Sequence, residues 1–106
     1  MSNEYQRFEI LLPLQFNDGQ PIPENLIVAT ELELEQRFGS ISTETQTIRG
    51  RWLHAGQTYR DELMRLFIDV LDTPENRQFF RDYKATLKER FQQKDIWITS
   101  TPLEIY

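Results

Sequence analysis

The chain has 106 residues, of which 39% are hydrophobic and 27% charged, and its formal net charge is −5. This length suits one domain with a single core, and the composition is typical of an ordinary folded protein rather than a disordered or fibrous one. The absence of cysteine excludes disulfides and thiolate metal sites, and the excess of acidic residues disfavours general attraction to nucleic acid or an anionic membrane.

The first residues lack the basic and apolar regions of an export signal, and no apolar run approaches the roughly 18 residues needed to cross a bilayer. We therefore expect a cytoplasmic protein.

The first predicted element is a strand over residues 5–16. Phe8, Ile10, Leu12 and their even-numbered neighbours alternate with more polar residues, which is the period of a strand with one buried side. Pro13 has no backbone N–H to donate, so regular pairing should end or bulge near it. The residues that follow, 17–21, carry the Asn, Asp, Gly and Pro typical of a turn.

A helix is predicted over residues 23–38. Pro23 suits the first helical position, and Gly39 suits the left-handed residue just past the end. Apolar residues at helical spacing form the predicted inner stripe, and the glutamates look outward. The members of that stripe are Leu26, Ile27, Ala29, Thr30, Leu34 and Phe38.

Two strands joined by a short turn come next. Residues 46–53 are polar and β-branched, which favours an edge strand, and Gly50 marks a bulge or a close approach. Residues 54–58 are short enough for a hairpin turn, with Gly56 supplying positive φ. The strand over residues 59–70 has one apolar side and one mixed side, which predicts an inner position in the sheet.

A second helix follows, and then a last strand over residues 95–105. Thr73 is the predicted cap of the helix, and Pro74 stands in its first turn. Phe80, Tyr83, Leu87 and Phe91 recur at three- and four-residue spacing and predict the buried stripe.

The order strand, helix, strand, strand, helix, strand predicts an α+β fold of the ferredoxin-like βαββαβ type. Right-handed crossovers and one hairpin are satisfied by a four-stranded antiparallel sheet with both helices on one face. The strand over residues 59–70 should then lie between the first strand and the strand over residues 46–53. Its mixed side becomes part of the open face of the sheet.

This open face is the candidate interaction surface. It should combine apolar side chains with charges of both signs, in an area large enough to need covering. The candidate residues are Leu11, Arg51, Tyr59, Asp61, Leu63, Arg65, Phe67 and Trp97, and we expect Arg7, Glu9, Arg49 and Thr99 beside them. Three interpretations remain open: a solvated face, a self-association surface, or a surface for a ligand or another protein.

No catalytic, cofactor or metal site is predicted. His54 is the single histidine and its position in a turn favours a surface role. Neither a serine-hydrolase elbow, a calcium loop nor a glycine-rich phosphate loop is present. RNA-binding sheets of this topology carry aromatics on a strand like that of Tyr59 and Phe67, but the two acids Asp61 and Glu62 and the missing basic-Gly-aromatic pattern argue against nucleic acid.

Three segments carry a resemblance to a known group. With residues 8–19, 49–52 and 59–63, the chain resembles small uncharacterised bacterial proteins of a kind common in cyanobacteria. The resemblance covers nearly the whole chain and implies a ferredoxin-like domain without an established activity.

The leading hypothesis is a non-catalytic module that associates through its open sheet face, as a homodimer or with another protein partner, and without nucleic acid or membrane. The alternative is a small enzyme or small-molecule binder whose cleft forms at the dimer face from Tyr59, Asp61, Arg65 and His54.

Overall fold

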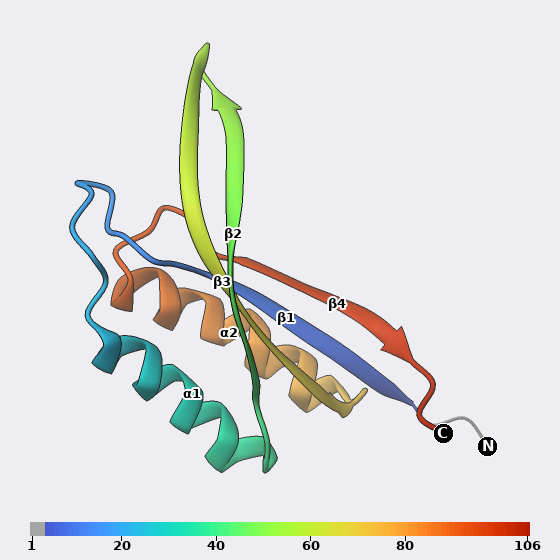
Figure 1. The fold of residues 1–106 in the computed structure, drawn as a ribbon. Coiled ribbons are helices and arrows are strands. Elements are labelled where there is room, and N and C mark those ends of the chain that lie inside the picture. The colour runs from blue at the N-terminus through green and yellow to red at the C-terminus, as the bar shows by residue number, and fades with distance from the viewer. Residues whose placement is uncertain (1–3) are drawn as a thin grey trace.

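A computed structural model describes residues 4–106. Its elements are β1 (Tyr5–Pro13), α1 (Glu24–Phe38), β2 (Ser42–His54), β3 (Gln57–Leu71), α2 (Pro74–Arg90) and β4 (Trp97–Leu103). The four strands form one antiparallel sheet in the order β2-β3-β1-β4, and both helices lie on the same face of it (Figure 1). The predicted ferredoxin-like arrangement is confirmed, with β3 between β1 and β2.

The core lies between this sheet and the two helices. Phe8, Ile10 and Leu12 of β1 are buried there, together with the even-numbered residues of β3 from Leu66 onward. Phe8 stacks on Phe80 of α2 with ring centroids 4.0 Å apart. The predicted stripe of α2 is confirmed, since Phe80, Tyr83, Leu87 and Phe91 are all buried. The odd-numbered residues of β1 and β3 therefore face away from the helices.

Pro13 determines where β1 ends, because it has no backbone N–H to donate to a neighbouring strand. β1 stops at Pro13 as predicted, and Leu14 then donates its N–H to the carbonyl of Glu62 at 2.9 Å. Beyond Pro13, Gln15 forms an isolated bridge with Pro21. β4 is shorter than predicted, because it spans Trp97–Leu103 instead of residues 95–105.

The predicted capping residues lie at the helix ends, except that Pro23 precedes α1 instead of occupying its first position. Pro23 has extended backbone, φ −60° and ψ 135°, so it precedes the helix as its cap and Glu24 takes the first helical position. Gly39 ends α1 in the left-handed region at φ 88°, as predicted. Thr73 caps α2 by accepting the N–H of Asn76 at 3.1 Å, also as predicted.

The β2–β3 hairpin is longer and more regular than expected. β2 begins at Ser42, and its irregularity lies between Glu44 and Ile48 rather than at Gly50. The turn consists of Ala55 and Gly56, at φ 52° and 77°, so both central residues adopt the positive φ of a two-residue type I′ turn. This turn fixes the register from His54 opposite Gln57 back to Ile48 opposite Leu63.

Part of this hairpin projects beyond the sheet. β3 pairs with β1 only from Leu63 onward, so residues 57–62 of β3 form a ladder with residues 49–54 of β2 alone. We call residues 49–62 the hairpin arm, which points away from both helices in Figure 1. The radius of gyration is 14.7 Å, whereas a compact chain of this length would have about 13 Å. The arm accounts for this elongation and presents two uncovered faces.

Candidate functional site

The centre of the open sheet face is held together by ion pairs around one aromatic ring. Phe67 lies between two guanidinium groups, with Arg7 4.8 Å and Arg65 4.6 Å from the ring centroid. Arg7 also binds Asp69 through two hydrogen bonds of 2.8 and 3.1 Å. Arg65 donates to Glu9 on β1 and to Glu44 on β2. Each charged group at this centre therefore already has a partner within the chain.

The same pairs keep the two arginines charged. The hydrogen bond to Asp69 raises the pKa of Arg7 above its ordinary value, and the bond to Glu9 raises that of Arg65. Both guanidinium groups are engaged by carboxylates, so the centre of the open face is a network of ion pairs around Phe67.

The end of the open face nearest the hairpin arm is apolar. Pro13, Leu63 and Ile48 are neighbours across three strands. In the next row, Leu11 lies between Arg65 and Trp97. The Trp97 side chain is 63% exposed. We call Leu11, Pro13, Ile48, Leu63 and Trp97 the apolar end. Trp97 is its exposed member, whereas Leu11, Ile48 and Leu63 are half-buried and Pro13 is buried.

An aromatic cluster continues from the apolar end along the arm. Trp52 stacks on Tyr59 with centroids 4.5 Å apart and an interplanar angle of 18°. The Trp52 indole Nε1–H donates to Oδ2 of Asp61 at 2.7 Å, and the His54 ring lies 6.1 Å from the indole. Trp52 remains 47% exposed and Tyr59 38%. This aromatic cluster, Trp52, His54, Tyr59 and Asp61, is ordered by its own contacts yet uncovered.

The structure brings together most of the predicted interaction residues. Tyr59, Asp61, Leu63, Arg65 and Phe67 alternate along β3 on one side, and the register adds Leu11 and Trp97 to the same face. Arg51 does not join them. It lies opposite Arg60 and one position out of phase with Asp61, so it belongs to the other side of the arm, and Arg49 does as well. The prediction placed both arginines on the open face because the register of the hairpin was set one residue off.

The predicted set lacked Trp52, as well as Pro13 and Ile48 beside Leu63. The sequence carried a signal for Trp52, since a two-residue Ala55-Gly56 turn places Trp52 directly opposite Tyr59. The Asp61 carboxylate accepts the indole N–H of Trp52 and makes no ion pair within residues 4–106.

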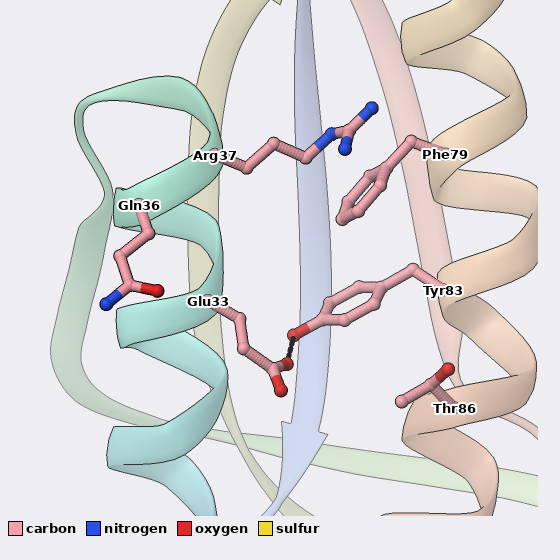
Figure 2. Close-up of a pocket in the computed structure, with 6 residues that line it drawn as sticks. All are labelled: Glu33, Gln36, Arg37, Phe79, Tyr83 and Thr86. Carbon is pink, nitrogen blue, oxygen red and sulfur yellow. Dashed lines mark hydrogen bonds between the residues drawn. The ribbon is translucent and has the colours of Figure 1, made fainter.

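A second polar cluster lies on the helical side. Glu33 of α1 accepts hydrogen bonds from Tyr83, at 2.6 Å, and from both Nη atoms of Arg90, at 2.9 and 2.7 Å. Figure 2 shows Glu33 and Tyr83 reaching toward each other across a shallow depression between the helices. At the rim of this depression, Arg37 lies over the Phe79 ring, with its guanidinium carbon 4.3 Å from the ring centroid. The arrangement ties α1 to α2.

The acid–base state of this cluster follows from these bonds. Hydrogen bonds from Arg90 lower the pKa of Glu33. Burial, reinforced by the bond to Glu33, raises the pKa of Tyr83 well above its ordinary range. Glu33 is therefore a carboxylate and Tyr83 a neutral phenol at physiological pH, as a structural link between helices requires.

The described part of the chain lacks two further features. Within residues 4–106, no three His, Asp or Glu side chains gather closely enough to hold a metal ion. No helix in that same range is long and apolar enough to cross a membrane.

Comparison with known proteins adds a structural likeness. No protein-family model matches the sequence, and no curated protein matches it. Among solved structures, the fold is similar to that of a phage SAM lyase in complex with S-methyl-5′-thioadenosine, with a TM-score of 0.72. The match covers 99% of this chain and 86% of that chain at 16% sequence identity. At this identity the likeness shows the fold alone, and the resemblance to small bacterial proteins stays a prediction.

Proposed function

We propose that this protein is a non-catalytic association module that forms a homodimer through the open face of its sheet, at the apolar end and the aromatic cluster. One observation carries the proposal. Trp52 and Trp97 leave 47% and 63% of their surface exposed on one continuous side of the sheet and arm. Large aromatic side chains are the residues that most often anchor protein interfaces.

The energetics favour covering this surface. Fully burying a large aromatic side chain removes about 150–250 Å² from water, and each Å² is worth about 25 cal/mol. A partner could bury only the part still exposed, 47% of Trp52 and 63% of Trp97. A two-fold contact buries the same patch on both copies, so every ring counts twice. Within residues 4–106 no helix covers this side, because both helices lie on the opposite face of the sheet (Figure 1).

The polar centre of the open face defines the edge of the proposed contact. Around Phe67 the charges are already paired, so a partner there would gain little and would have to desolvate those pairs. The dimer contact that we propose therefore uses the apolar end as its core and leaves the ion pairs at its rim.

The test is the molar mass in solution, measured by light scattering after size exclusion and by sedimentation over a concentration series. We expect a dimer for the wild type and a folded monomer for Trp97→Asp. Leu71→Asp is the matched control, since Leu71 is 53% exposed on the same face at the far end of β3. Phe67→Asp is a poorer probe because Phe67 contacts two arginines of its own chain. A monomeric wild type at high micromolar concentration would overturn the proposal.

The second candidate function is small-molecule binding at the same face, closed by the second copy. The likeness to a phage SAM lyase holding S-methyl-5′-thioadenosine favours it. Aromatic rings stack on nucleobases, and a carboxylate such as Asp61 can accept hydrogen bonds from ribose hydroxyls. Here Trp52 and Tyr59 would supply the rings, while His54 and Arg65 would lie nearby.

This candidate is tested by titrating S-methyl-5′-thioadenosine into the protein and following heat and Trp fluorescence. If binding occurs here, Tyr59→Ala should weaken it and Arg37→Ala, in the depression between the helices, should leave it unchanged. Absence of binding at millimolar ligand would exclude this class of ligand and leave the association module as the function.

A further inference from the structure

The other face of the hairpin arm carries three arginines and one glutamate, Glu62, which lies opposite Arg49. Arg51 lies directly opposite Arg60, and Arg49 precedes Arg51 by two residues on the same side. None of the three makes an ion pair with another residue of the described range 4–106. Like charges that face each other across a ladder destabilise it. Near the tip, Leu53 is 71% exposed on this side.

The outward face of α1 has the opposite character. Val28 and Leu32 are one helical turn apart and are 40% and 48% exposed. Glu24, Glu31 and Glu35 fall at four- and seven-residue spacing along one flank of that pair. Neither Glu24 nor Glu35 forms an ion pair among the residues that the structure describes. This face is an apolar pair bordered by the exposed Glu24 and Glu35 and by Glu31, whose carboxylate accepts a hydrogen bond from Thr43.

We propose that the basic face of the hairpin arm in one copy binds the outward face of α1 in a second copy. Leu53 would pack against Val28 and Leu32. Arg51 and Arg60, which face each other without an acidic partner, would pair with Glu24 and Glu35, so the charges are opposite in sign. Planar guanidinium groups suit such contacts because each can bind a carboxylate with two hydrogen bonds.

The contact has to form between copies. The arm projects from the sheet away from the helices, so its tip and its own α1 lie in different parts of the molecule (Figure 1). Because two different surfaces meet, the contact is head-to-tail and builds closed rings or open chains. It is separate from the dimer contact proposed above, which lies on the opposite side of the arm, and it does not depend on it.

The test is a charge swap followed by sedimentation velocity. One variant carries Arg51→Glu and Arg60→Glu, and the other carries Glu24→Arg and Glu35→Arg. We expect each variant alone to lose the head-to-tail association, with at least a tenfold weaker apparent affinity. The equimolar mixture should recover it, because each reversed surface then meets its complement. The wild-type association should weaken in 0.5 M NaCl.

The background variant Trp97→Asp separates the two proposed contacts. Head-to-tail association that survives in Trp97→Asp and disappears in the charge variants supports the inference whatever the fate of the dimer. The inference is overturned if the charge variants associate as the wild type does, or if their mixture fails to recover association while circular dichroism shows both folded. It is equally overturned if a 20-base-pair DNA duplex, and not a second copy, binds in an Arg51- and Arg60-dependent manner.

Discussion

Two regions of strand β3 carry the same alternating pattern but differ in whether their charged and aromatic side chains find partners within the chain. Around Phe67, Arg65 and Asp69 find partners on β1 and β2, and the aromatic ring is enclosed by guanidinium groups. In residues 57–62, Arg60 finds only Arg51 opposite, and the Tyr59 ring remains exposed on its outer side. The difference lies in the number of neighbouring strands, because the inner region has one on each side and the arm has only β2.

The comparison shows what a third strand does for charged residues. On the inner region, β1 supplies Glu9 and Arg7 at the positions where Arg65 and Asp69 need them. The arm has no such third strand, and its arginines make no ion pair within residues 4–106. Its unpaired charges and exposed rings are therefore the features that a partner can use, whereas those of the sheet centre serve the fold.

The largest expected difference between the two regions is in unfolding free energy. Leu66→Ala should lower it by about 2–5 kcal/mol, because Leu66 is fully buried beneath the sheet centre. Leu53→Ala should change it by no more than about 0.5 kcal/mol, because Leu53 is 71% exposed on the arm. Urea unfolding of dilute, monomeric protein measures both. Similar losses for the two variants would contradict the exposure of Leu53 on the arm of the monomer.

The fold was predictable because its signals are local. Alternation in β1, the Thr73-Pro74 start of α2 and the left-handed Gly39 each fix one element, and the order of elements then leaves one simple topology. The bounds were less predictable. Whether β2 begins at Ser42 or four residues later depends on pairing with β3, and no property of β2 alone reports it.

The open face was partly predictable for a related reason. Which residues of β3 share a side follows from period two, so Leu63, Arg65 and Phe67 were identified correctly. Which residues of β2 join them depends on register, and a one-residue error exchanged Arg51 for Trp52. The projection of the arm was not predictable, because it depends on β1 ending opposite Leu63.

A smaller difference in unfolding free energy is expected between removal of the paired Arg65 and removal of the unpaired Arg51. Arg65→Ala should cost about 1–2 kcal/mol, because Glu9 and Glu44 lose their partner and Phe67 loses one of its two guanidinium contacts. Arg51→Ala should be neutral or stabilising by a few tenths of a kcal/mol, since it removes the repulsion of Arg60. Thermal unfolding at low and high salt measures both. A greater loss for Arg51→Ala than for Arg65→Ala would contradict our assignment of paired and unpaired regions.

The smallest expected effect is a pH-dependent difference in unfolding free energy between variants of two glutamates on α1. Glu33 is ion-paired with Arg90, whereas Glu35 makes no ion pair within residues 4–106. Contacts with Arg90 and Tyr83 lower the pKa of Glu33, so its ionised form stabilises the native state. This contribution is fully present above the unfolded pKa of about 4.3 and is lost as pH falls through the lower folded value. Glu33→Gln should therefore be less stable than the wild type at pH 7, and the gap should narrow toward pH 3.

Glu35→Gln is the matched control, because Glu35 lies two residues away on the same helix and its side chain makes no ion pair within the described chain. Its stability should follow the wild type across the whole pH range. Since Glu33 is partly exposed, with 45% of its side chain accessible, the gap at pH 7 should stay near about 1 kcal/mol or below. A gap for Glu33→Gln that is independent of pH would mean that its packing between the helices, rather than its charge, stabilises the fold.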